Sequence, residues 1–183
     1  MLDILEMIAN AVASVLGGVL LLRFWMQSVR IRPPIQVGQF LYTLSDWLVK
    51  PLRRVMPGFG GFDWASLLGA FLVAMIYGAV FIALRGRLFF GPVLIVAFIT
   101  ILQWVAYGFT GLILLGVVFS WVNPHAPNAP FVFALSAPVL RPLRRIIPPV
   151  GGLDLSPMVA LLILQIFIFK LIPELGRLLF GLL

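Results

Sequence analysis

The sequence predicts an all-α integral membrane protein with four transmembrane helices, arranged as two tandem two-helix repeats. Hydrophobic residues make up 62% of the 183-residue chain, and charged residues make up only 10%. A water-soluble domain is typically about 25% charged, so this chain has less than half of the charge that a water-facing surface uses. A basic motif that occurs twice, 91 residues apart, predicts the two repeats.

The first predicted span covers residues 7–22, which contain no charge and precede Arg23 and Trp25. Because this stretch is slightly shorter than the about 20 residues that cross a bilayer, we expect Arg23 to extend to the lipid headgroups beside Trp25, an interfacial residue. Acidic Asp3 and Glu6 stand where a signal peptide has basic residues, which favours an uncleaved helix.

The third apolar segment is too long for a simple span. Residues 88–122 would form a helix of about 52 Å, whereas the hydrocarbon core is about 30 Å thick. Gly91-Pro92 and Gln103 are possible sites for a break. We therefore place the third span near residues 102–122 and expect residues 88–101 to form an interfacial or partly inserted helix.

The second and fourth spans are simpler predictions. Residues 64–84 contain no charged side chain and are long enough to cross the bilayer. Residues 155–172 predict the fourth span. Pro173 is then expected to end the helix, leaving residues 174–183 as a short tail.

Basic residues gather in two of the linkers, between spans one and two and between spans three and four. The positive-inside rule therefore predicts that both linkers are cytoplasmic and that both termini lie outside. The eight residues are Arg30, Arg32, Lys50, Arg53, Arg54, Arg141, Arg144 and Arg145.

A 15-residue motif occurs at residues 50–64 and again at residues 141–155. Eight of the 15 positions are identical, whereas chance would give about one. The conserved core of both copies reads Pro-Leu-Arg-Arg, then Pro, then Gly-Gly-x-Asp. The motif predicts a first repeat over residues 1–87 and a second over residues 88–183, each a helix, a basic Pro-bounded loop and a helix. With an even number of spans each, the copies are expected to be parallel in the membrane.

The aspartates of the motif, Asp63 and Asp154, come directly before the next predicted spans. A carboxylate at this position accepts hydrogen bonds from free backbone N–H groups and favours the positive end of the helix dipole, so helix capping is the main interpretation. An Arg–Asp pair within the loop, or a proton or cation site, is the alternative.

The basic side chains of the motif have two interpretations. They act as a topology signal that also contacts anionic lipid, or they form a specific site for a lipid headgroup or a partner protein. Nucleic acid is not expected as a partner, because no aromatic platform or groove-reading motif accompanies the charge. The candidate binding residues are Lys50, Arg53, Arg54, Arg141, Arg144 and Arg145.

Residues 36–49 carry apolar side chains at helical spacing and predict an amphipathic helix on the membrane surface. Their counterpart, residues 131–140, has almost no polar face and is expected to lie between helices or to dip into the bilayer. Trp47 and Trp121, like Trp25, are expected at the membrane interface.

Glycines in the first and third spans favour close helix packing, and a pore-lining stripe is the alternative. These residues are Gly17, Gly18, Gly108, Gly111 and Gly116.

The sequence resembles the YggT family, known as YlmG in other bacteria and in plastids. The resemblance rests on Leu-Leu-Arg-Phe-Trp ending at Trp25, on both Pro-Leu-Arg-Arg-x-x-Pro and both Gly-Gly-x-Asp segments, and on Ser120-Trp121. It covers nearly the whole chain.

One family feature is altered. Members often carry an Asp-Pro pair shortly before the basic motif, but here Asp46 is followed by Trp47, and the second copy has Ala137 before Pro138. The resemblance implies a bacterial inner-membrane protein, or its plastid kin. In that membrane the orientation predicted from the basic residues has cytoplasmic basic loops and periplasmic termini. Relatives are linked to maturation of a membrane cytochrome, to division and nucleoid organisation, and to osmotic tolerance through ion uptake.

The chain has no Cys and a single His, His125, which excludes Cys-ligated metals and multi-His sites within one chain. No catalytic motif appears within a span, so we expect neither a catalytic residue nor a cofactor or metal. The favoured hypothesis is a non-enzymatic assembly or organisation factor that binds anionic lipid and other membrane proteins, or self-associates. The alternative is an oligomeric channel or transporter, for which the spans offer few polar residues, namely Asn10, Ser14, Gln103, Thr110 and Gln165.

Overall fold

A computed structural model describes residues 2–84, 86, 89–147 and 154–182. Within these ranges the regular elements are helices, and an isolated bridge joins Phe59 to Phe62. The elements are α1 (Leu2–Ser28), α2 (Ile35–Val55), α3 (Trp64–Leu84), α4 (Phe90–Val122), α5 (Ala129–Ile146), α6 (Ser156–Ile166), the π-helical turn η1 (Phe167–Leu171) and α7 (Ile172–Gly181).

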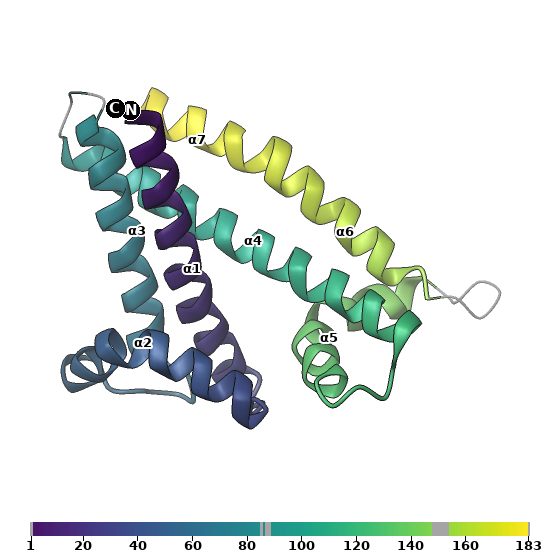
Figure 1. Ribbon diagram of the computed structural model, residues 1–183. Helices are drawn as coiled ribbons and strands as arrows, with labels where there is room; N and C mark the ends of the chain where they lie inside the picture. The colour runs from purple at the N-terminus through teal and green to yellow at the C-terminus, as the bar shows by residue number, and fades with distance from the viewer. Residues whose placement is uncertain (1, 85, 87–88, 148–153, 183) are drawn as a thin grey trace.

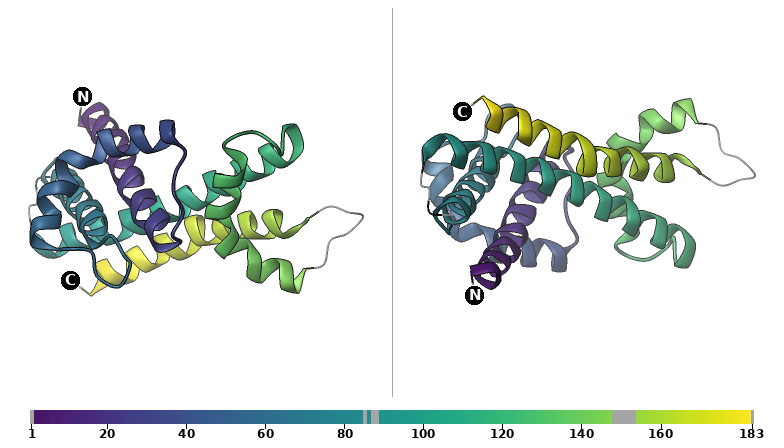
Figure 2. Two further views of the ribbon diagram at one scale, coloured as in Figure 1. Left: turned by 90° about the horizontal axis from the view of Figure 1, so that it is seen from below. Right: turned by 90° about the horizontal axis from the view of Figure 1, so that it is seen from above.

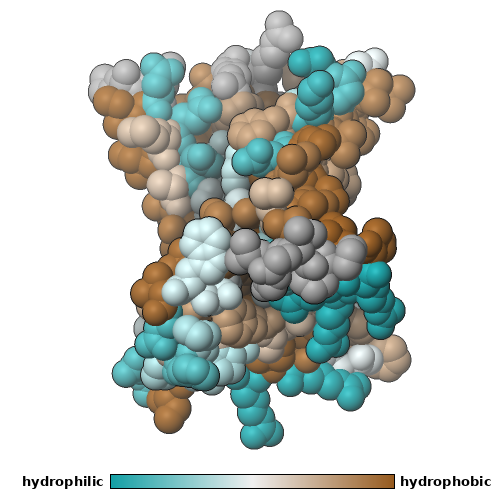
Figure 3. Space-filling view, turned by 90° about the vertical axis from the view of Figure 1, so that its right-hand side faces the viewer, coloured by the Kyte–Doolittle hydropathy of each residue, from teal (hydrophilic) through white to brown (hydrophobic). Residues whose placement is uncertain are grey.

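Four helices in the described ranges are long and apolar enough to cross a membrane, which confirms the predicted all-α membrane class. They are Asp3–Ser28, Trp64–Leu84, Phe90–Val122 and the continuous helix Ser156–Gly181. Hydrophilic side chains gather toward the two ends of the face in Figure 3, and hydrophobic ones lie between them.

The helices form two connected groups (Figure 1). α1 and α3 pack side by side, and α2 lies across one end of this pair. α4 runs obliquely away from α3, and the α6–η1–α7 helix follows it, as both views in Figure 2 show. α5 packs on α4 and α6 toward the end at which α2 lies, whereas both termini lie at the opposite end.

A close contact joins α1 to α4. A Cβ added to Gly17 would overlap the Trp104 ring, whose Nε1 donates a hydrogen bond to Ser14 Oγ at 3.1 Å. A Cβ at Gly18, Gly108 or Gly111 would meet no atom within 4 Å. The predicted role of glycine in close packing is therefore confirmed at Gly17 and wrong at Gly18, Gly108 and Gly111, whereas a Cβ at Gly116 would make only an ordinary contact with Phe133, at 3.8 Å.

The predicted division of the third apolar segment is wrong. Phe90–Val122 is one helix of 33 residues. Pro92 is its third residue, and the N–H groups of a first turn have no partner within the helix, so proline fits there. Residue 88 lies outside the described residues.

The prediction that Pro173 ends the last helix is also wrong. The helix continues to Gly181, and the π-helical turn Phe167–Leu171 directly precedes Ile172 and Pro173. Pro173 lacks an N–H and its ring crowds the carbonyl four residues earlier, that of Phe169. The wider π turn contains Phe169, so the chain accommodates the proline without ending the helix.

The Pro-Leu-Arg-Arg segments of both motifs are helical rather than loops. Pro51 lies inside α2, and Pro142 lies inside α5, so each arginine pair falls in the last turn of its helix. Leu48 and Leu52 pack on the core around the fully buried Val49. This burial offsets the cost of an internal proline, about 3 kcal/mol, which explains why the helix continues past Pro51.

A tight bend follows α2 within the first motif. Gly60 and Gly61 have φ values of 68° and 85°, in the left-handed region that glycine adopts at little cost. The equivalent Gly151 and Gly152 lie outside the described residues.

Candidate functional site

Asp63 is the centre of a buried ion-pair network where α1, α2 and α3 meet. Its carboxylate is 1% exposed and accepts hydrogen bonds at 2.7 Å from Arg53 Nη2 and from Ser66 Oγ. The backbone N–H of Ser66 also donates to Asp63 Oδ1, at 3.4 Å. Asp63 therefore combines the two interpretations, because it both caps α3 and pairs with an arginine.

Arg23 is the second centre of the network. Its side chain is 7% exposed, and its Nη1 donates to Asp46 Oδ1 at 2.6 Å and to Ser45 Oγ at 2.8 Å. Its Nε lies 3.4 Å from Asp63 Oδ2, and its guanidinium lies over the Tyr42 ring. Arg23 does not extend to the headgroups as predicted, because α2 brings acceptors to it across the end of α1.

The network keeps its carboxylates ionised. Burial acts to raise the pKa of Asp63, but hydrogen bonds from Arg53 and Ser66 and the charges of both arginines outweigh it and lower this pKa. The pKa of Asp46 is also lowered, since the hydrogen bonds and charges of Arg23 and Lys50 outweigh the effect of burial.

The second repeat has a simpler pair. Arg144 Nε donates to Asp154 Oδ2 at 2.8 Å, and the Ser156 N–H donates to Asp154 Oδ1 at 3.0 Å. The Asp154 side chain is 40% exposed. Burial acts to raise the pKa of Asp154, but hydrogen bonds from Ser156 and Arg144 outweigh it and lower this pKa.

The other predicted binding residues face outward. Lys50 is exposed and pairs with Asp46 at 3.0 Å. The remaining basic residues of the motifs are also exposed, and within the described ranges none of them pairs with a carboxylate. These are Arg54, Arg141 and Arg145.

The three tryptophans predicted at the interface have different surroundings. Trp47 and Trp121 are exposed, and the Nε1 of Trp47 donates to the Leu44 carbonyl of its own helix. Trp25 instead joins the two repeats, since its Nε1 donates to the Leu135 carbonyl of α5 at 3.0 Å and its ring packs edge-on against Phe109.

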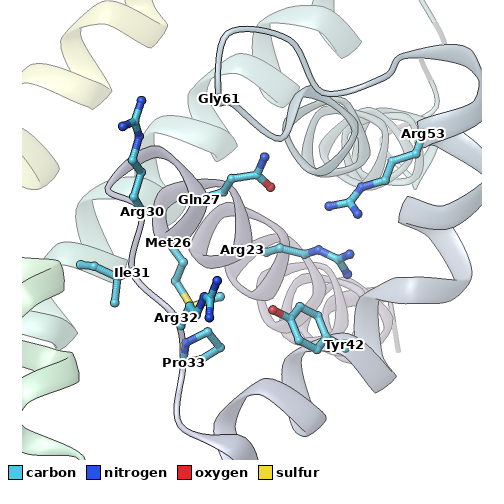
Figure 4. A pocket seen from close by; sticks show the side chains of 10 residues that line it. All are labelled: Arg23, Met26, Gln27, Arg30, Ile31, Arg32, Pro33, Tyr42, Arg53 and Gly61. Atoms are coloured by element: carbon cyan, nitrogen blue, oxygen red, sulfur yellow. The ribbon is translucent and has the colours of Figure 1, made fainter.

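An open pocket of about 420 Å³ adjoins the network (Figure 4). Sequence reasoning did not find it, because it joins the end of α1, the following linker, α2 and the bend before α3. The basic residues of this linker, Arg30 and Arg32, were the sequence feature that could have indicated an anion-binding pocket. The lining residues are Arg23, Met26, Gln27, Arg30, Ile31, Arg32, Pro33, Tyr42, Arg53 and Gly61.

Within the described ranges, no three His, Cys, Asp or Glu side chains gather in a way that could hold a metal ion. The arrangement is suited to binding anions, because arginine donors converge where carboxylates neutralise only some of them.

Comparison with known proteins gives a family match over most of the chain. A CCB3/YggT family model matches residues 2–84 and 95–175. The two segments fit the predicted tandem repeat, one in each half.

Curated relatives agree with this match. The chain is 32% identical to the uncharacterized protein YggT of Escherichia coli K12, over 90% of this chain and 87% of the relative. It is 34% identical to an uncharacterized protein of Pseudomonas aeruginosa, over 86% and 83%. It is 32% identical to one of Haemophilus influenzae, over 80% and 79%. No solved structure matches the chain.

Proposed function

The chain belongs to the CCB3/YggT family, and from that premise we propose that it is a non-enzymatic assembly or organisation factor of the bacterial inner membrane. The basic ends of α2 and α5 bind anionic lipid headgroups on the cytoplasmic side and hold these helices at the membrane surface. The termini lie in the periplasm. Partner membrane proteins, or further copies of the chain, pack against the spans.

The observation that carries this proposal is that α2 and α5 share a location and a basic last turn. Both lie toward the end of the molecule opposite the termini, and both end in a basic turn (Figure 1). α2 also exposes large apolar side chains, Phe40 and Trp47, next to exposed Lys50. An amphipathic helix of this kind lies in the interfacial plane and contacts acyl chains and anionic headgroups together.

The ion pairs determine which basic residues test the proposal. Arg53 and Arg144 hold Asp63 and Asp154, so changing them would also disturb the fold. Arg54 and Arg145 are exposed and lie one in each repeat. The double variant Arg54→Gln/Arg145→Gln therefore removes two surface charges and leaves both ion pairs in place.

The experiment measures lipid preference in nanodiscs that contain equal amounts of phosphatidylglycerol and phosphatidylcholine. Native mass spectrometry then counts the lipids that stay on the protein. Each basic side chain near an anionic leaflet contributes about 1 kcal/mol, so the variant should lose about 2 kcal/mol, or roughly thirtyfold, of its preference. The matched control Lys170→Gln/Arg177→Gln removes the same charge from the last helix and should retain the preference.

Two results would overturn the proposal. The protein could retain phosphatidylglycerol and phosphatidylcholine equally, or both double variants could lose preference to the same extent. Partners are tested by gentle extraction from the native membrane and native mass spectrometry, where a discrete co-purifying membrane protein or a homo-oligomer is expected.

A further inference from the structure

The pocket beside Arg23 contains more positive charge than its neighbours neutralise. Four arginines line it, and no carboxylate does. Asp46 and Asp63 are not among the lining residues, and they balance Arg23 and Arg53 through the ion pairs described above. The other two arginines are exposed and, in the part of the chain that the structure describes, pair with no carboxylate. They are Arg30 and Arg32.

The donors come from different segments and border one open space. In Figure 4 the guanidinium groups of Arg23 and Arg53 lie close together on one side, the Gln27 amide points toward them, and Arg32 and the Tyr42 hydroxyl lie across from them. Arg30 lies at the edge, and its guanidinium points away from the other donors in this view. Arginine binds phosphate oxygens through two parallel N–H donors, which makes such a cluster a phosphate site.

The backbone at Arg30 gives an independent indication. Arg30 has a φ of 56°, and the Ile31 N–H donates to the Met26 carbonyl at 2.9 Å while the Arg30 N–H donates to the Gln27 carbonyl at 3.0 Å. This is the left-handed helix end at which glycine is usually found. An arginine there is strained, and such strain is typical of positions that keep a side chain for function.

We infer that this pocket binds a phosphate monoester dianion. The two unpaired arginine charges match the two charges of the ligand. The pocket volume, about 420 Å³, exceeds that of a phosphate group and leaves space for part of the alcohol that carries it. The inference goes beyond the proposed function, because Arg30 and Arg32 lie outside the basic ends of α2 and α5. The phosphate is carried either by a lipid such as phosphatidic acid or by a soluble ester.

The test uses the full chain in an uncharged maltoside detergent and isothermal titration calorimetry. The two probes are dihexanoyl phosphatidic acid and glycerol 3-phosphate. We expect saturable binding of one molecule per chain, weakened at least tenfold in Arg30→Gly/Arg32→Gln. If a lipid carries the phosphate, dihexanoyl phosphatidic acid should bind at least tenfold more tightly than glycerol 3-phosphate. If a soluble ester carries it, the two probes should bind with similar affinities.

The variants separate lost binding from lost folding. Arg30→Gly places glycine at the left-handed position, so its melting temperature should be unchanged or higher while affinity falls. Arg177→Gln removes one charge from the last helix and should bind like the unmodified protein. Absence of saturable binding of both probes would overturn the inference, as would unchanged affinity in Arg30→Gly/Arg32→Gln or an equal loss in Arg177→Gln. None of these results depends on lipid preference at α2 and α5.

Discussion

The two copies of the basic motif hold the same ion pair in different surroundings. In each copy the arginine precedes its aspartate by ten residues, and the pairs measure 2.7 Å for Arg53–Asp63 and 2.8 Å for Arg144–Asp154. Yet the aspartate is 1% exposed in the first repeat and 40% exposed in the second. The motif therefore determines the pair, whereas residues outside the motif determine its burial.

Those outside residues are present only in the first repeat. Arg23 reaches from α1 to both Asp46 and Asp63. At the position equivalent to Asp46, the second repeat has Ala137, and α4 contains no charged residue at all. The second repeat thus has no equivalent of Arg23 or of Asp46, so its Arg144–Asp154 ion pair stays at the surface.

The largest difference in stability should come from replacing the motif aspartates, Asp63 and Asp154, with asparagine one at a time. Asp63→Asn removes the buried carboxylate that pairs with Arg53 and Arg23 and leaves Asp46 as the remaining partner of Arg23, so it should lower the free energy of unfolding by about 3 kcal/mol. Asp154→Asn should cost no more than about 1 kcal/mol, as for an exposed pair. Thermal unfolding in detergent measures both. Equal losses would contradict the difference between the repeats.

A glycine pair tests the packing of α1 against α4. Gly17→Ala pushes a methyl group into the Trp104 ring and should cost about 1 to 3 kcal/mol of stability. Gly108→Ala enters open space and should be neutral or slightly stabilising. The same unfolding measurement applies, and a destabilised Gly108→Ala together with a neutral Gly17→Ala would contradict the packing.

A tryptophan pair tests the contact between the repeats. Trp25→Phe removes the hydrogen bond to the Leu135 carbonyl and should cost about 1 kcal/mol. Trp121 is 77% exposed, so Trp121→Phe should leave stability unchanged. The indole fluorescence lost in each variant identifies the emission of each tryptophan. A larger loss of stability in Trp121→Phe would show that the predicted difference is wrong.

The response of stability to pH is expected to be the smallest effect, because it is negligible near neutral pH and develops only in acid. Because the pKa of Asp63 is lowered in the folded protein, its contribution is fully present above the ordinary aspartate pKa of about 3.9. That contribution is lost as the pH falls through the lower folded pKa. Melting temperatures from pH 7 to pH 2 should fall more steeply for Asp154→Asn, which keeps Asp63, than for Asp63→Asn. Parallel curves would contradict the assignment.

Much of the fold could be predicted because hydropathy alone identifies spans. Two of the errors concern proline: burial around Val49 offsets its local cost at Pro51, and the π-helical turn accommodates it at Pro173. For the site, the spacing of Arg53 and Asp63 allowed a pair to be named as an alternative. Burial of Arg23 could not be predicted, because it depends on α2 folding back across α1.

The buried position of Arg23 imposes an order of events on synthesis. Asp46 follows Arg23 by 23 residues and Asp63 follows it by 40. At ribosomal rates of about 5–20 residues per second, Asp63 is made roughly 2 to 8 seconds after Arg23. A lone guanidinium avoids hydrocarbon, so during this interval the end of the first span stays in the headgroup layer. The Arg23 side chain then exchanges the headgroup layer for its ion pairs with Asp46 and Asp63, once α2 and α3 have folded against α1. Burial of Arg23 therefore indicates that the first repeat is fully assembled.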